Sequence, residues 1–319
     1  MANILFTNHC NRNCCYCFAG EKLSGKKEAK SQMSLEDLKR VIDFMKSSGL
    51  TVFSILGGEP TLHTDFINAF EMVRKARFKH IKLFSNGLIP KKHLEYLASL
   101  PKQNLSVIIN INQPSETPEA EKSRVQETLK TLGEIITLGV NIYRTDMDLE
   151  FLVENILKFN LCRNIRLGLA QPILGANNIY LPIESYKKVG KQIVQFSLIC
   201  DKHDIRIGCD CGLLFCMFDE EDYGKLVKHN VDFRRLCSPI IDIGVDLAVW
   251  SCFPLSRFEP RHLSEFKTYD EIYKFYRKKM QPYKNVGVMK ECLDCKYKNR
   301  GQCTAGCVSH IINSFSKIK

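Results

Sequence analysis

The sequence predicts an α/β fold in which strands and helices alternate, followed by a cysteine-rich C-terminal region. Six short apolar runs, each typical of a buried strand, alternate with segments whose apolar residues recur at helical spacing. This order predicts successive βα units with parallel strands and right-handed crossovers, in a partial TIM-like barrel or a doubly wound sheet. The 319 residues suffice for one large α/β domain plus a smaller one.

The repeating units are expected to fill the first two thirds of the chain. The predicted strands cover residues 3–7, 52–56, 81–84, 105–111, 140–143 and 165–169. The predicted helices cover residues 34–48, 66–76, 93–100, 119–138, 149–159 and 184–202. The first helix has Ser34 as a suitable N-cap, with Asp37 three residues later. We expect the units to end near His203, which divides the chain into residues 1–203 and 204–319.

Composition and charge limit the classes of protein that fit. No apolar run reaches the roughly 18–20 residues of a membrane helix, and the first residues do not form a signal peptide. We therefore expect a cytoplasmic protein with reduced thiols, in which 15 cysteines indicate metal binding. The formal net charge is +11, but the basic residues are scattered, so nucleic acid is not the favoured partner.

The first predicted strand is followed by a loop with a distinctive cysteine spacing. Cys10, Cys14 and Cys17 follow the pattern C-x3-C-x2-C, and Tyr16 precedes the last of them. Such a short loop can bring three thiolates onto one face of an iron–sulfur cluster, which leaves one iron of a four-iron cube for another ligand. The alternative is a zinc site whose fourth ligand is His9 or Cys15.

This loop resembles the signature loop of the radical SAM enzymes. The resemblance implies that the three cysteines hold a [4Fe–4S] cluster, and that S-adenosylmethionine (SAM) chelates the free iron through its amino and carboxylate groups. It also favours the partial (β/α)6 TIM-like barrel over the doubly wound sheet. In barrel-type folds the chemistry lies at the C-terminal ends of the strands.

Further motifs follow the next strand ends. Gly57-Gly58-Glu59 comes after the second strand and resembles the GGE motif of the same enzymes, which contacts the amino group of SAM. The resemblance also suggests other residues that line the SAM pocket: Tyr16, Ser85, Asn86, Asn110, Asn112 and Arg124. The alternative for these is an ordinary turn, a strand-end cap or a solvated helix position. The sequence identifies no catalytic acid or base.

Nine cysteines lie in the last third of the chain. They include the run Cys292-x2-Cys295-x7-Cys303-x3-Cys307, and the segment 246–252 reads as a hairpin strand that leads to Cys252. This arrangement resembles the SPASM domain, which carries auxiliary [4Fe–4S] clusters in radical SAM enzymes. The resemblance implies one cluster held by Cys216, Cys237, Cys252 and Cys307, and a second held by Cys292, Cys295 and Cys303.

The match to the SPASM pattern is incomplete. No cysteine follows Cys307, so the second cluster needs an upstream ligand such as Cys211, keeps an open iron, or is absent as in the shorter "twitch" form. Residues 254–287 are polar and weakly periodic, so we expect metal ligation to stabilise this region. Cys15, Cys162, Cys200 and Cys209 are expected to be spare thiols in ordinary packing.

The resemblance implies a radical SAM oxidoreductase that cleaves SAM reductively to a 5′-deoxyadenosyl radical, which abstracts hydrogen from the substrate. SPASM enzymes most often modify ribosomally made peptides, so we expect a peptide maturase of RiPP biosynthesis that crosslinks, epimerises or oxidises its substrate. The expected partners are a peptide, an electron donor such as flavodoxin or ferredoxin and, because the chain starts at the first strand, a separate leader-binding protein. The alternatives are a radical SAM dehydrogenase of a small molecule and a zinc-ribbon nucleic-acid-binding protein.

Overall fold

The fold is built on one curved sheet, which confirms the predicted α/β class. The computed structural model describes residues 2–20, 31–210, 212–229, 231–233 and 236–316. The strands are β1 (Ala2–Leu5), β2 (Val52–Leu56), β3 (His80–Ser85), β4 (Leu105–Asn110), β5 (Ile136–Ile142), β6 (Asn164–Leu169), β7 (Arg206–Cys209), β8 (Asp232–Phe233), β9 (Ile241–Ile243), β10 (Ala248–Ser251) and β11 (Arg261–His262). Their order in the sheet is β11-β10-β9-β1-β2-β3-β4-β5-β6-β7-β8.

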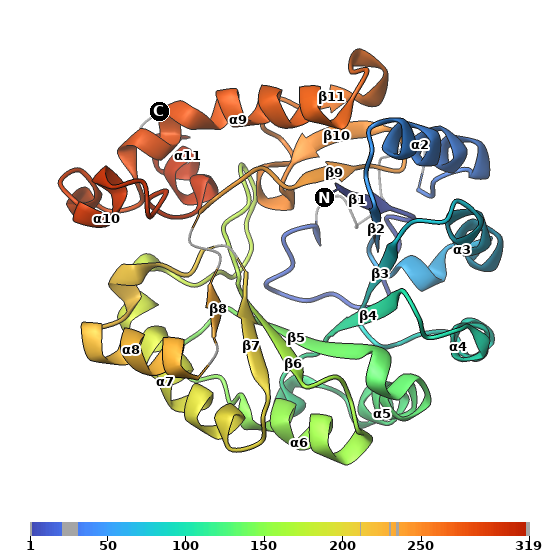
Figure 1. Ribbon diagram of the computed structural model, residues 1–319, viewed down its shortest axis with the longest axis horizontal. Helices are drawn as coiled ribbons and strands as arrows, with labels where there is room; N and C mark the ends of the chain where they lie inside the picture. Colours follow the sequence, from blue (N-terminus) through green and yellow to red (C-terminus); the bar gives the residue numbers. More distant parts are fainter. Residues whose placement is uncertain (1, 21–30, 211, 230, 234–235, 317–319) are drawn as a thin grey trace.

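Helices cover the convex side of this sheet, as Figure 1 shows, and the loop after β1 runs across its concave side. The helices are α2 (Leu35–Ser47), α3 (Phe66–Lys75), α4 (Lys91–Ser99), α5 (Glu119–Leu132), α6 (Glu150–Phe159), α7 (Tyr186–Asp201), α8 (Glu220–Lys228), α9 (Tyr269–Val286), α10 (Lys296–Asn299) and α11 (Val308–Ser316). Strands β1 to β6 are neighbours in chain order and pair in parallel. This is the arrangement of an open, TIM-like series of βα units. Among the described residues, no helix has the length and apolar character needed to cross a bilayer.

The first helix begins as the sequence predicts. The Ser34 hydroxyl accepts a hydrogen bond from the backbone N–H of Asp37 at 3.1 Å, which satisfies one of the N–H groups left free at the start of α2. The buried residues Leu38, Val41 and Met45 lie on one face of the helix, which packs onto the sheet.

The boundary between α5 and β5 differs from the prediction. The expected helix 119–138 ends at Leu132, because Gly133 adopts a positive φ of 55°. Ile136 then enters β5 and pairs with Val107 of β4, so two apolar residues read as the end of a helix belong to the sheet. Here the pairing of β5 with β4 decides the secondary structure, although the apolar residues also recur at helical spacing.

The sheet also continues beyond the expected end of the repeating units. Strand β7 pairs in parallel with β6, with Arg206 opposite Asn164, and β8 pairs with β7. The division of the chain at residues 203 and 204 stays a prediction. On the other edge, β9 pairs in parallel with β1, which brings Ile241 opposite Ala2. The last third therefore extends the sheet that the first strand began.

Two features of the last third bear on its stability. The predicted hairpin strand before Cys252 is β10, which pairs antiparallel with β9. The interpretation of residues 254–287 as weakly periodic is wrong for their second half, since α9 is 18 residues long and begins with a Thr268 N-cap. It buries Ile272, Tyr276 and Met280 at four-residue spacing, so this region has apolar packing of its own.

Candidate functional site

The loop after β1 brings the three predicted cysteines together. The backbone N–H of Cys17 donates to the carbonyl of Cys14 at 3.0 Å, which folds the loop into a turn. Burial, together with the nearby Cys14 and Cys10 thiols, raises the pKa of Cys17 to about 11. Burial also raises the pKa of Cys10, to which Glu59 and Cys14 contribute. Metal binding displaces the protons of cysteine ligands, so a group of neighbouring thiols fits the binding of a positively charged metal cluster.

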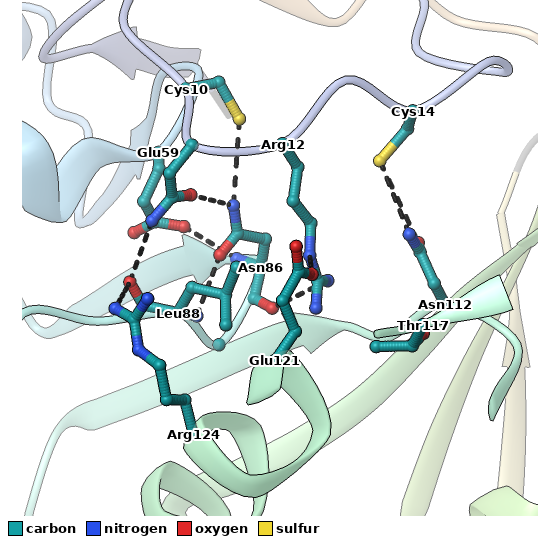
Figure 2. Close-up of polar contacts among 12 residues, drawn as sticks. Cys10, Arg12, Cys14, Glu59, Asn86, Leu88, Asn112, Thr117, Glu121 and Arg124 are labelled. Carbon is teal, nitrogen blue, oxygen red and sulfur yellow. Dashed lines mark hydrogen bonds and ion pairs between the residues drawn. The ribbon is translucent and has the colours of Figure 1, made fainter. Parts of the chain in front are cut away.

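Two asparagine side chains from neighbouring strand ends point at these sulfurs (Figure 2). The Asn86 amide donates to the Cys10 Sγ atom at 3.7 Å, and the Asn112 amide donates to the Cys14 Sγ atom at 3.6 Å. Such donors stabilise a thiolate and are a recurring way to tune a bound iron–sulfur cluster. The structure thus brings Asn86 and Asn112, both expected near the cofactor, onto the cysteine loop.

Tyr16 joins the same contacts. Its hydroxyl donates to the side-chain oxygen of Asn112, and its ring stacks on Tyr143 with centroids 4.7 Å apart. Burial and the nearby Cys14 thiol raise the pKa of Tyr16, so its hydroxyl remains a neutral donor. Tyr16 therefore orients Asn112 toward Cys14, a role that the sequence did not reveal.

An arginine inside the loop was also missed by the sequence analysis. The Arg12 guanidinium pairs with Glu121 of α5 at 2.9 Å and donates to the carbonyl of Asn86 at 3.1 Å (Figure 2). Its side chain is only 5% exposed, so the contact is protected from solvent. Arg12 fastens the cysteine loop to the end of β3 and the start of α5. The sequence around Arg12 does not indicate this contact, because the carboxylate of Glu121 is 109 residues away in the chain.

The two glycines after β2 allow this loop to lie close to the strand end. A Cβ atom on Gly58 would lie 2.2 Å from the carbonyl oxygen of His9, and one on Gly57 would lie 2.6 Å from that of Thr7. The Gly58 N–H donates to the Thr7 carbonyl at 2.9 Å. Glycine has no Cβ atom and therefore permits such a close approach. In the structure, the group that approaches is the backbone of the cysteine loop.

Glu59 is fully buried, and protein donors surround its carboxylate. One carboxylate oxygen accepts from the N–H and the hydroxyl of Thr61 at 3.2 and 2.7 Å. The other accepts from the Ser85 hydroxyl at 3.0 Å and the Asn86 N–H at 2.7 Å. Burial raises the pKa of Glu59, while these hydrogen bonds lower it. A carboxylate offers about four acceptor positions, so we expect Glu59 to join the ends of β2 and β3 rather than to bind the SAM amino group directly.

Replacing Glu59 by Gln should therefore destabilise the protein. An amide nitrogen cannot accept the two hydrogen bonds on its side, and the loss should lower the free energy of unfolding by roughly 1–3 kcal/mol. Urea unfolding of the metal-free protein measures this effect. Glu36→Gln is the control, since Glu36 is 76% exposed in a surface pair with Arg40. Unchanged stability with weaker SAM binding would instead place Glu59 on the ligand.

The remaining predicted residues divide between two places. The Arg124 guanidinium lies at the same edge and donates to the Leu88 carbonyl at 3.5 Å (Figure 2). Asn110 belongs to a separate network, in which its oxygen accepts from Arg166 at 3.0 Å while Arg166 also pairs with Asp210. Asn110 and Asn112 thus serve different sites.

This second network was not foreseen from the sequence. A Cβ atom on Gly139 would lie 2.6 Å from the side-chain oxygen of Asn110. Glycines in strand interiors often mark a close approach, and Gly139 in β5 and Gly168 in β6 are the signal that was available. Arg166 lies within β6 and Asp210 directly follows β7, so their ion pair joins two neighbouring strands.

The C-terminal cysteines form two groups, and Cys216 lies in the one that was not expected. The three-thiol group contains Cys237, Cys252 and Cys307. The four-thiol group contains Cys216, Cys292, Cys295 and Cys303. Cys211 lies outside the described residues. Partial burial and the nearby Cys292 and Cys303 thiols raise the pKa of Cys216 to about 11.

In the described part of the chain, no three His, Cys, Asp or Glu side chains are arranged to hold a single metal ion. A four-iron cube requires a wider spacing of its ligands than a single ion does, because each thiolate binds a different iron. Of the four thiols expected to be spare, Cys200 and Cys209 are buried in the core, Cys162 is partly exposed, and Cys15 is exposed. Cys15 is therefore not a packing thiol.

Comparison with protein families matches residues 4–147 to the radical SAM superfamily. This segment carries the cysteine loop, the glycine pair and the polar strand ends described above. The chain thus contains a segment of the radical SAM superfamily over residues 4–147. This match favours the radical SAM interpretation over the zinc-ribbon alternative.

Curated relatives match only part of the chain. The 7,8-dihydro-6-hydroxymethylpterin dimethyltransferase of Methanocaldococcus jannaschii is 36% identical over 121 residues, which are 37% of this chain and 23% of that protein. A probable GTP 3′,8-cyclase of Methanococcus maripaludis is 24% identical over 146 residues, 46% of this chain and 47% of that protein. The subtilosin biosynthesis protein AlbA of Bacillus subtilis is 24% identical over 156 residues, 46% of this chain and 34% of that protein. The chain thus spans less than half the length of each.

Solved structures share the fold over nearly all of the chain. Streptococcus suis SuiB bound to S-adenosylmethionine has a TM-score of 0.70 at 16% identity, covering 98% of this chain and 73% of SuiB. Native anSMEcpe with bound AdoMet has a TM-score of 0.65 at 18% identity, covering 99% of this chain and 95% of that one. SuiB is also known bound to the precursor peptide SuiA, and anSMEcpe bound to the Cp18Cys peptide.

Proposed function

We propose that this protein is a radical SAM peptide maturase with auxiliary iron–sulfur clusters in its last third. The observation that carries the proposal is the extent of the structural similarity. The fold shared with SuiB and anSMEcpe covers 98% and 99% of this chain, so it reaches past the family segment 4–147 into the cysteine-rich region. Both of those proteins are known with peptides bound.

The residues of the first loop fit a [4Fe–4S] cluster. Cys10, Cys14 and Cys17 would hold it, and the amides of Asn86 and Asn112 would stabilise their thiolates. When bound, the cluster and SAM supply a one-electron cleavage of SAM and hydrogen abstraction from an unactivated carbon.

The surrounding residues keep this loop in place and bind what lies beside it. Arg12 fixes the loop against the end of β3 and the start of α5, and Glu59 joins the ends of β2 and β3, so the thiol positions are set before any ligand arrives. Arg124 makes no ion pair with a carboxylate in the described ranges and can bind the carboxylate of SAM. The Arg166–Asp210 pair, which lies between β6 and the end of β7, offers charged groups for a peptide.

The proposal includes partners and a compartment. An electron donor such as flavodoxin or ferredoxin would deliver the electron, a separate protein would recognise the peptide leader, and the enzyme would work in the reducing cytoplasm. Crosslinking, epimerisation and oxidation remain the expected classes of peptide change.

A small-molecule substrate is the second candidate. The observation that favours it is the similarity of part of the chain to a GTP 3′,8-cyclase and a pterin dimethyltransferase, at 24% and 36% identity. The two candidates differ in the molecule that gives its hydrogen to the 5′-deoxyadenosyl radical. Transfer of deuterium from a labelled substrate into 5′-deoxyadenosine therefore distinguishes them.

The test uses the full chain, reconstituted with iron and sulfide without oxygen and reduced by dithionite. With SAM it should form 5′-deoxyadenosine, and deuterium should enter this product from deuterated peptides encoded by reading frames beside its own gene. Deuterium entering only from labelled GTP would favour the small-molecule candidate. If no 5′-deoxyadenosine forms with any substrate, the protein does not catalyse SAM cleavage and the proposal fails.

A further inference from the structure

Among the described residues, the two cysteine groups of the last third are unequal, and aromatic packing explains why Cys216 joins the larger one. Phe215, the residue before Cys216, stacks on Tyr297 with ring centroids 4.6 Å apart. Tyr297 lies in α10, in the chain segment between Cys295 and Cys303. A surface ion pair between Glu220 and Lys296, at 3.6 Å, joins the same two segments. The geometry therefore holds Cys216 against the run that contains Cys292, Cys295 and Cys303.

The three-thiol group is held together from separate elements. The Cys237 N–H donates to the Thr304 hydroxyl at 2.6 Å, and the Cys252 N–H donates to the Ile240 carbonyl at 2.7 Å. Burial and the nearby Cys237 thiol raise the pKa of Cys307 to about 11. Within the described ranges, the three thiols thus form a partly buried group without a fourth cysteine.

A buried lysine lies beside this smaller group. Lys284 of α9 is 8% exposed, and its ammonium group donates to the carbonyl oxygen of Cys237 at 2.6 Å. Within the described residues it forms no ion pair with a carboxylate. An ammonium ion removed from water without a counter-charge costs several kcal/mol. The position of Lys284 therefore points to an anionic group next to Cys237.

The charges of an iron–sulfur cube match this requirement. A [4Fe–4S] core with three thiolates carries roughly one negative unit, whereas four thiolates give roughly two. One ammonium group balances the first case. Asp242, which interacts electrostatically with Cys252, adds further negative charge on that side and increases the need for a cation.

We propose that the last third holds two different cluster sites: a complete one with Cys216, Cys292, Cys295 and Cys303 as its four ligands, and a three-thiolate one with Cys237, Cys252 and Cys307, whose counter-cation is Lys284. The three-thiolate cluster keeps one iron open to an exogenous ligand. This inference rests on the proposed presence of auxiliary clusters, and it reassigns the ligand that the SPASM pattern placed elsewhere.

The test uses the full chain with Cys10, Cys14 and Cys17 replaced by Ala, so that only the auxiliary clusters report. This parent should hold about eight irons, two cubes of four. Lys284→Met should move the midpoint potential of one cluster to a more negative value, because reduction adds negative charge that Lys284 no longer balances. Lys284→Arg should keep the parent potential. EPR-monitored redox titration measures both, and the iron content shows whether each variant retains its clusters.

Cyanide, which binds an open iron, locates the incomplete site. It should change the EPR spectrum of the Lys284-sensitive cluster only, and in Cys216→Ala it should change both spectra. Cys162→Ala, which removes a thiol outside both groups, is the control. If Cys216→Ala alters the Lys284-sensitive cluster and spares the other, or if Lys284→Met shifts neither potential, the inference is wrong. A parent without iron–sulfur clusters would instead refute the auxiliary clusters themselves.

Discussion

Replacing Cys10, Cys14 and Cys17 together by Ala should abolish SAM cleavage while the protein stays folded. The three thiols lie in one loop, where burial and neighbouring thiols raise the pKa of both Cys10 and Cys17, and they are the three ligands that the proposed cluster needs. With dithionite and SAM, the variant should produce no 5′-deoxyadenosine. It should retain about eight of about twelve irons per chain, if each site binds a four-iron cube.

Cys15→Ala is the matched control for this experiment. Cys15 lies in the same loop, but its side chain is exposed and it belongs to neither C-terminal group. This variant should keep the full iron content and full SAM cleavage. Production of 5′-deoxyadenosine by the triple variant would show that another group of residues cleaves SAM. An iron content near eight in the wild-type protein would support a single auxiliary cluster.

Gly58→Ala should cause the second largest loss. The new methyl group would lie 2.2 Å from the His9 carbonyl oxygen and 2.9 Å from the Cys10 Cβ atom, and the first of these is backbone that cannot rotate away. Overpacking of this kind costs roughly 1–3 kcal/mol. Since the displaced segment carries Cys10, SAM cleavage should also fall by roughly 100-fold, the effect of about 1 Å of misplacement at a reacting centre.

Thermal unfolding and single-turnover formation of 5′-deoxyadenosine measure the two effects. Gly20→Ala serves as the control, because a Cβ atom at Gly20 meets no atom of the described residues within 4 Å. Gly20→Ala should be close to wild type in both measurements. Full activity in Gly58→Ala would mean that the cysteine loop shifts without cost, and that the close approach seen here is not required.

The sequence predicted the parallel strands well because each one is a short apolar run bounded by turn residues. It failed at Ile136 and Leu138, where an apolar pair fits a helix and a strand equally and only pairing with β4 decides between them. Helix α9 was missed for a related reason. Its buried face continues from Met280 to Lys284. Because lysine is a charged residue, this position interrupts the apolar pattern by which an amphipathic helix is recognised in a sequence.

The site shows the same limit. Spacing along the chain was enough to select Cys10, Cys14 and Cys17, because their relationship is local. The partner of Arg12 lies 109 residues away in the sequence. The contact between Phe215 and Tyr297 likewise joins two segments that are distant in the sequence and share no motif. Only the fold brings those residues together, so Arg12 and the position of Cys216 could not be inferred from a pattern of residues.

The pairing of β1 with β9 has a consequence for how the chain acquires its structure. Ala2 lies opposite Ile241, and the Asn3 side chain donates to Asp242 across 239 positions of sequence. During synthesis from the N-terminus, one edge of β1 therefore remains without its partner until most of the chain has left the ribosome. Contacts between such distant segments slow folding and leave strand edges open to aggregation. The segment that bears the C-terminal cysteines would close that edge last, so premature termination before residue 241 should yield an aggregation-prone product even though every unit from β2 to β6 is complete.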